Sequence, residues 1–196
     1  MDFDEVVRRR RSVRSYRPEA PDAALLDRLG DRARRAPTAG FSQGIDFVVL
    51  DAVEQVDRFW QLTADPDDRG HDEDLPPALV LILADPMRYV ARYSDPDKIE
   101  FGLDEMEAWP VRFWDVDAGM AAMQLQLAAV NEGLATWFFG IADGEPELRA
   151  ALGIPDDRNM IGVVALGYRT DDEVPTGSGT IRSRRPLDEQ LHRNGW

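Results

Sequence analysis

The apolar positions near the start of the chain repeat with the period of a helix. Residues 3–11 (FDEVVRRRR) form the first predicted helix, and its acidic start and basic end both match the helix dipole. Residues 20–36 predict a second helix, in which Leu25, Leu26 and Leu29 share one side while the other side is charged. The second helix therefore has one face suited to a core.

A different period marks the elements that come next. Residues 45–51 (IDFVVLD) and 77–85 (PALVLILAD) are predicted strands, and the unbroken apolar run of the second indicates burial on both faces of a sheet. Residues 53–64 (VEQVDRFWQLTA) predict a helix between them. The polar residues 65–77 (DPDDRGHDEDLPP) are expected to form a loop or a disordered lid. Residues 91–114 carry mixed signals and predict no clear element.

One long apolar segment dominates the second half of the chain. Residues 115–133 (DVDAGMAAMQLQLAAVNEG) predict a helix with an Asp N-cap and Gly133 as its stop. Because apolar side chains cover most of its circumference, we expect this helix to be buried in a core or at a subunit interface. An apolar segment at 134–141 (LATWFFGI), a helix at 145–153 (EPELRAALG) and a last strand at 160–168 (MIGVVALGY) complete the pattern.

Charge and composition narrow the classes of function. The 196 residues include 37 acidic and 23 basic ones, which gives a formal net charge of −14, and 43% are hydrophobic. Such a chain most simply forms one domain, residues 1–196. The negative charge disfavours nucleic acid and anionic membranes as partners. The sequence has no cysteine, and its two histidines, His71 and His192, are far apart, so it offers no thiol nucleophile and no zinc site.

The remaining sequence signals concern location and the basic residues. No run of about 18 apolar residues occurs, and residues 1–10 lack the apolar core of a signal peptide, so we expect a cytoplasmic protein. Arginine clusters stand near both ends of the chain, in residues 8–14 and 182–185. Four consecutive arginines at a helix end are, taken alone, more typical of a solvated surface than of an anion site.

Five pieces of the chain, in this order, resemble the FMN-dependent nitroreductase-like superfamily. Residues 10–16 (RRSVRSY) resemble the family's basic opening segment, and residues 36–47 (APTAGFSQGIDF) resemble the loop before its first strand. The long apolar helix that ends in glycine comes next, and residues 152–155 (LGIP) form the turn before the strand VVALGY. Residues 182–189 (RSRRPLDE) resemble the basic C-terminal segment. The match covers nearly all of the chain except residues 52–110.

The resemblance implies a fold, a cofactor and a phosphate site. The fold is α+β: a three-layer α/β/α nitroreductase-like arrangement with a mostly antiparallel central sheet around a long buried helix, in a homodimer. FMN is the implied cofactor, without a metal. Arg10 and Ser12, with Arg11 in the same segment, would hold the FMN phosphate together with Arg182 or Arg184. An arginine fork makes bidentate, charge-assisted hydrogen bonds to phosphate that a lysine makes less well.

The same resemblance assigns the flavin end of the site. Arg14 would lie near N1 and O2 of the flavin, where a positive charge favours the anionic reduced form. The loop before the first strand would approach the cofactor from the other subunit, and backbone amides after the long helix would face N5. The implied contact residues are Pro37, Thr38, Ala39, Gly40 and Gln43 in the loop, and Phe138, Phe139 and Gly140 after the helix.

One stretch departs from the family's pattern. Where the family loop usually has Asn and then Pro-Trp, this chain has Phe41 and then Gly44 and Ile45. An apolar residue at this point is similar to the branch that includes the flavin destructase, which fragments reduced FMN with oxygen. That branch tends to carry Asp where Ser12 stands here, so the resemblance to it is partial.

Two hypotheses of function are consistent with these residues. In the first, the chain is a homodimeric flavin oxidoreductase: NAD(P)H delivers hydride to FMN, and an electron-poor acceptor such as a nitroaromatic or a quinone takes the electrons in a ping-pong cycle. The flavin performs this chemistry, so the lack of a Ser/His/Asp or paired-carboxylate constellation is no objection. In the second, the fold binds a flavin or deazaflavin without turnover, as a storage or sensing protein, and the altered loop favours this view.

Overall fold

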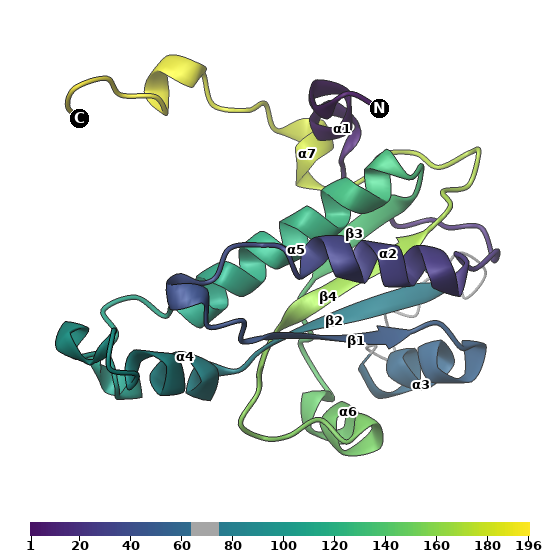
Figure 1. Ribbon diagram of the computed structural model, residues 1–196. Helices are drawn as coiled ribbons and strands as arrows, with labels where there is room; N and C mark the ends of the chain where they lie inside the picture. Colours follow the sequence, from purple (N-terminus) through teal and green to yellow (C-terminus); the bar gives the residue numbers. More distant parts are fainter. Residues whose placement is uncertain (64–74) are drawn as a thin grey trace.

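The computed structural model describes residues 1–63 and 75–196 (Figure 1). The helices in these residues are α1 (Phe3–Arg9), α2 (Ala23–Ala33), α3 (Val53–Thr63), α4 (Pro86–Tyr93), α5 (Phe113–Asn131), α6 (Glu145–Leu152) and α7 (Ser178–Ile181). The strands are β1 (Ile45–Leu50), β2 (Ala78–Ala84), β3 (Ala135–Phe139) and β4 (Asn159–Gly167). The short 3₁₀ helices are η1 (Ala39–Phe41), η3 (Ile99–Phe101), η4 (Met106–Ala108) and η5 (Leu187–Glu189).

The four strands form one antiparallel sheet in the order β1-β2-β4-β3. All seven residues of β2 are buried, which confirms the two-sided burial predicted from its unbroken apolar run. Side chains alternate along β4: Val164 and Leu166 face the cluster that contains α2 and α5, while Val163 and Ala165 face the cluster that contains α3 and α6. The sheet is therefore the middle of three layers, as Figure 1 shows, and the predicted α+β fold is confirmed.

Helix α5 has two different sides. One side packs in the core through residues such as Ala118, Ala122 and Leu125. On the other side Met120 and Met123 are exposed, so the apolar circumference predicted from the sequence is only half covered within one chain. An uncovered apolar stripe of this kind is typical of a subunit interface.

Several predicted element boundaries are wrong by a few residues. Helix α1 ends at Arg9 because Arg10 adopts an extended conformation. Helix α2 begins at Ala23 because the carboxylate of Asp22 accepts a hydrogen bond from the backbone N–H of Ala24. Asp115 is not an N-cap, since α5 begins two residues earlier at Phe113.

The segments that the sequence left open are only partly accounted for. The part of residues 91–114 that comes after α4 contains η3 and η4 before α5 begins. Most of the predicted loop or lid at 65–77 lies outside the described residues, as does His71. In Figure 1 the C-terminal tail extends beyond the outline of the body after α7. Within the described ranges, no helix is both long enough and apolar enough to cross a membrane.

Candidate functional site

The basic segment at residues 10–16 lies along the edge of the sheet. Ser12 forms a parallel bridge with Thr136 of β3, and the Val13 N–H donates to the Thr136 carbonyl at 3.0 Å. At its far end Tyr16 bridges to Arg169, just after β4, and the buried Tyr16 hydroxyl donates to the Val13 carbonyl at 2.7 Å. Burial raises the pKa of the Tyr16 phenol, which therefore stays a proton donor. The segment is thus fixed beside β3.

Arg14 lies over the aromatic side chains of β3. Its guanidinium carbon is 5.0 Å from the ring centroid of Trp137, which in turn stacks on Phe139 at 4.4 Å. The start of the C-terminal tail is also close, because a Cβ atom placed on Gly177 would lie 3.7 Å from Arg14 Nη1. The structure therefore brings Arg14, β3 and the beginning of the tail together.

The end of β3 also carries an exposed aromatic side chain, Phe138, on the opposite face of the strand from Trp137. Phe138 is 38% exposed and Phe139 is half-buried between Phe59 and Trp60. Within the described residues, a Cβ atom on Gly140 would meet nothing within 4 Å. Thr136 and Phe138 are two residues apart in a strand, so their side chains are on the same face of the sheet.

Arg10 and Arg11 differ in their partners. Arg11 makes a bidentate pair with Glu173, with one N–O distance of 2.8 Å, and this bond raises the pKa of Arg11. Glu173 is almost completely buried, so Arg11 serves to tie the segment to the residues after β4. Across the residues that the structure describes, neither Arg10 nor Arg14 forms an ion pair. Arg10 and Arg14 are therefore the arginines of this segment that remain available to an anion.

A basic cavity of about 600 Å³ opens next to Arg11. Arg8 and Arg9 both pair with Glu5, and these hydrogen bonds lower the pKa of Glu5. Such exposed pairs contribute little to stability. No sequence pattern singled out Arg169, which reaches the cavity only because the chain returns to Tyr16 after β4. The arginines that line the cavity are Arg8, Arg9, Arg11 and Arg169.

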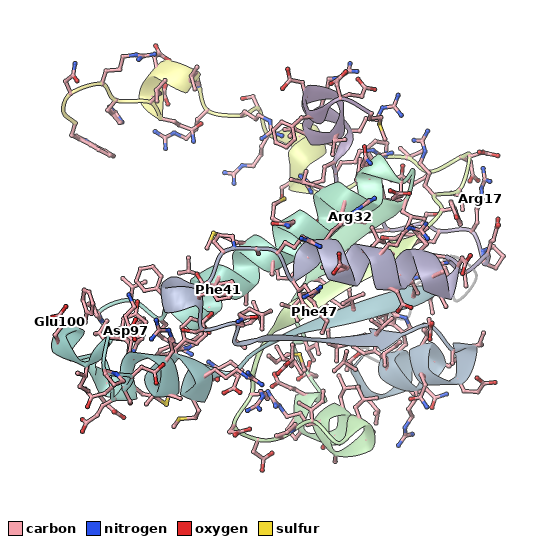
Figure 2. All side chains as sticks on the ribbon, viewed as in Figure 1. Arg17, Arg32, Phe41, Phe47, Asp97 and Glu100 are labelled. Carbon is pink, nitrogen blue, oxygen red and sulfur yellow. The ribbon has the colours of Figure 1, made fainter. Side chains whose placement is uncertain are left out.

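The loop predicted to reach the flavin lies elsewhere on the molecule. Its Ala39 N–H donates to Asp117 near the start of α5, whereas the Ser12 segment contacts Thr136, which bonds to Gln126 further along the same helix. Asp117 and Gln126 are nine residues apart, or about 13 Å along the helix axis. Figure 2 shows Arg17, next to the basic segment, at the right-hand edge of the molecule and Phe41 of this loop well to its left. Within one chain, the loop at residues 37–43 and the basic segment are therefore not in contact.

The C-terminal arginines have no side-chain link to the basic segment. Arg182 and Arg184 are exposed in the tail, and the N–H of Arg182, the residue after α7, donates to the carbonyl of Ser178, the first residue of α7. In the described parts of the chain, no ion pair links Arg182 or Arg184 to another residue. The two ends of the chain therefore approach each other through Gly177 and Arg14, and the joint grip of their arginines on one phosphate stays a prediction.

Trp109, just before α5, and Trp114, in its first turn, belong to the core. Trp109 and Trp114 are buried around Tyr89, with ring centroids 5.9 Å and 6.1 Å from it, and the Trp109 indole N–H donates to the Leu103 carbonyl. Phe113 is exposed. Core packing therefore accounts for the two tryptophans. No cluster of three or more residues able to bind a metal occurs among the residues described.

The fold and the arginine-rich edge of β3 agree with one class of protein. The Nitroreductase family model matches residues 7–73 and 77–168, and the chain belongs to this family. Over 174 residues it is 24% identical to a protein of Archaeoglobus fulgidus named "Putative NADH dehydrogenase/NAD(P)H nitroreductase", and the alignment covers 86% of each chain.

Solved structures share the fold. The nitroreductase family protein of Streptococcus pneumoniae TIGR4 matches with a TM-score of 0.76 and 18% identity, over 98% of this chain and 100% of the other. A "putative nitroreductase in complex with FMN" from Exiguobacterium sibiricum 255-15 matches with a TM-score of 0.75 and 20% identity, over 99% and 98%. At these identities the likeness establishes the fold, while the site must be argued from the residues of this chain.

Proposed function

We propose that the protein is an FMN-dependent oxidoreductase that uses NAD(P)H to reduce an electron-poor acceptor, such as a nitroaromatic or a quinone, by a ping-pong mechanism. The observation that carries the proposal is the placement of Arg14 over Trp137 at the end of β3, where the backbone at Gly140 is open. This edge joins a cation, an aromatic surface and an unobstructed strand end. Such a combination suits a planar cofactor with an anionic tail.

The residues at this edge have separate roles in the proposal. Arg10 and Ser12 bind the phosphate, together with Arg182 or Arg184 once the tail folds over them. Arg14 faces the N1 and O2 side of the flavin ring and stabilises negative charge there. When bound, FMN would accept the hydride from NAD(P)H and pass the electrons to the acceptor, so the chain needs no catalytic side chain of its own.

The proposal includes a homodimer. The loop at residues 37–43 is anchored about 13 Å along α5 from the contact that supports the basic segment, so the loop and the segment are held apart within one chain. The exposed Met120 and Met123 on α5 provide an apolar surface that a second copy would cover. In this arrangement each loop reaches the cofactor of the partner. A flavin-loaded species that sediments as a monomer would contradict it.

A second function is supported by one residue. Phe41 stands where the family usually has Asn, so a flavin contact typical of the family is missing from the loop. This favours either a protein that binds a flavin or deazaflavin for storage or sensing, or an oxygen-dependent enzyme similar to the flavin destructase. Both alternatives keep the fold and the arginine-rich edge, and they differ from the oxidoreductase in the fate of the flavin after it has bound.

One experiment separates these possibilities. The absorbance spectrum of the purified protein is recorded, and NAD(P)H is then added under nitrogen. Yellow flavin bands that bleach, and that return when a quinone is added, support the oxidoreductase. Bands that persist support storage or sensing. Bands that bleach and do not return when oxygen is admitted support flavin fragmentation. A colourless protein that FMN does not reconstitute would reject all three.

The proposed protein is one FMN-binding domain, residues 1–196, that works in the cytoplasm. Contacts between the two ends of the chain support the single domain, since Tyr16 bridges to Arg169 and Arg14 lies near Gly177. The core clusters on the two faces of the sheet both draw residues from early and late parts of the sequence. Expression of residues 1–168 alone tests the domain assignment. If residues 169–196 are part of the same FMN-binding domain, the shortened chain should lose FMN affinity.

A further inference from the structure

The loop at residues 37–43 has an unusual backbone. Gly40, Phe41 and Gln43 have φ values of 62°, 59° and 53°, all in the left-handed region. Glycine adopts this conformation freely, but Phe41 and Gln43 carry side chains that make it unfavourable. Phe41 is also 74% exposed, so core packing does not explain why the ring is held there. Strained residues of this kind persist only where the surrounding structure fixes them.

Helix α4 supplies the first set of supports. A Cβ atom on Gly40 would lie 2.6 Å from the Tyr93 ring, and one on Gly44 would lie 2.6 Å from the Tyr89 ring. The two rings therefore pack directly against the loop backbone at its two glycines. Arg92 adds a hydrogen bond from Nε to the Gly40 carbonyl at 2.8 Å. The loop is held along most of its length by one helix.

A buried carboxylate on α5 supplies the second support. Asp117 Oδ2 accepts one hydrogen bond from the Ala39 N–H at 2.8 Å and another from the Tyr89 hydroxyl at 2.9 Å. Asp117 is only 2% exposed, and it forms no ion pair with any residue that the structure describes. A buried carboxylate without a cation is unfavourable unless hydrogen bonds compensate it. Burial and the bond to Asp117 raise the pKa of Tyr89, so its phenol remains a donor.

We propose that Asp117 and Tyr89 are positioning residues that hold the loop so that Phe41 is presented to the acceptor. In this arrangement Phe41 is a specificity-determining residue: its ring forms one wall of the acceptor site and favours planar aromatic acceptors, such as quinones, over small polar ones. The inference rests on the proposed oxidoreductase function. It adds to that function the residue that selects the acceptor and the residues that keep it in place.

Hydrogen exchange in the apoprotein tests the positioning roles without any activity measurement. In Asp117→Ala the Ala39 amide loses its acceptor, so we expect it to exchange at least about tenfold faster. Tyr89→Phe keeps the ring on Gly44 and removes one bond to Asp117, so a smaller acceleration is expected. Asp117→Asn retains a carbonyl oxygen and should restore part of the protection.

Leu148→Ala is the matched control for general destabilisation. Leu148 is buried on α6, in the cluster on the other face of the sheet. This variant is expected to lower the melting temperature while the Ala39 amide keeps the exchange rate of the parent under native conditions. Equal acceleration at Ala39 in Leu148→Ala and Asp117→Ala would overturn the positioning role.

Kinetics of the FMN-loaded protein test Phe41. Phe41→Gly relieves the left-handed backbone and removes the ring, so the melting temperature should stay the same or rise while the KM for a quinone rises about tenfold relative to the KM for ferricyanide. Phe41→Leu keeps apolar bulk without an aromatic face and should give an intermediate ratio. A parallel change in both KM values, or a lower melting temperature in Phe41→Gly, would overturn the specificity role.

The two proposals fail in different ways. If the parent protein neither binds FMN nor oxidises NAD(P)H, the proposed function and the role of Phe41 fall together, and the hydrogen-exchange result still decides whether Asp117 holds the loop. If the parent is active and the Phe41 variants keep the quinone to ferricyanide ratio of the parent, only the inference about Phe41 fails.

Discussion

The basic segment beside β3 and the loop at residues 37–43 are built in opposite ways. The segment is held by a backbone hydrogen bond to Thr136 and by the Arg11–Glu173 pair, and its Arg10 and Arg14 lack ion-pair partners in the described structure. The loop is held by side chains, above all Asp117, and its own Phe41 is the part left exposed. The first region leaves two of its charges, Arg10 and Arg14, for a ligand to neutralise. The second neutralises its own polar groups and presents an apolar ring.

The stability of the apoprotein should depend much more on the side chains that support the loop than on the arginines of the segment. Asp117→Ala leaves the part-buried Ala39 N–H and the buried Tyr89 hydroxyl without an acceptor, so the free energy of unfolding should fall by about 2–5 kcal/mol. Urea denaturation of the apoprotein measures it. The control Asp57→Ala removes an exposed carboxylate from α3 and should change stability by less than about 0.5 kcal/mol. Equal losses of stability in Asp117→Ala and Asp57→Ala would show that the protein does not depend on Asp117 to hold the loop.

The reverse result is expected at the segment. Arg10→Ala and Arg184→Ala should each weaken FMN binding roughly ten- to a hundredfold, because a charge-assisted hydrogen bond to phosphate contributes about 1.5–3 kcal/mol. The apoprotein should unfold at the same urea concentration as the parent. Flavin fluorescence titration gives the affinity, and Arg58→Ala, an exposed arginine on α3, is the control. Unchanged titrations in both variants would refute the phosphate assignment.

Arg14 is expected to affect the redox chemistry of the flavin more than its binding. If it lies near N1 and O2, its charge acts mainly on the reduced, anionic flavin, so Arg14→Gln should lower the FMN midpoint potential by about 30 mV, or about 1.4 kcal/mol for two electrons. Oxidised FMN should bind nearly as well as before. Spectroelectrochemical titration beside Arg17→Gln, which removes a surface pair with Asp171, measures the difference. A potential equal to that of the parent would exclude this role.

The smallest expected effect concerns pH and the surface pairs around the segment. Arg8 and Arg9 lower the pKa of Glu5 below its usual value of 4.5. A lowered folded-state pKa means that the pairs contribute stability above the unfolded pKa and lose it as the pH falls through the folded pKa. Glu5→Gln should therefore make the free energy of unfolding slightly less dependent on pH below about pH 4.5. The FMN affinity measured at pH 7 should not change. A change in FMN affinity would show that these pairs also shape the ligand site.

The sequence predicted the parts of the fold that depend on local pattern. The apolar run at 77–85 became the fully buried β2, and the glycine-terminated apolar segment became α5. The basic segment was assigned from its order among other motifs, and the structure places it beside β3. These features are recognisable because neighbouring residues in the sequence determine them.

The parts that were missed depend on residues far apart in the sequence. Asp117 was predicted only as one residue of an apolar helix, and its partners Tyr89 and Ala39 lie 28 and 78 positions away. Arg11 was grouped with the phosphate residues, yet it pairs with Glu173, 162 positions later. No local period reveals such pairs, because an isolated charged residue has the same sequence signature whether it meets a ligand or another side chain.

Helix α5 connects the loop at residues 37–43 with the β3 edge, and so could couple the two cofactor sites of the proposed dimer. It contacts the loop through Asp117 near its start and the β3 edge through Gln126 further along. In the proposed dimer the loop serves the partner's cofactor and the β3 edge serves the chain's own, so each α5 touches both sites. A packed helix moves as a rigid unit, and ordering one end constrains the other. The two FMN molecules should then bind with unequal affinities, which calorimetry would register as cooperativity between chemically identical sites.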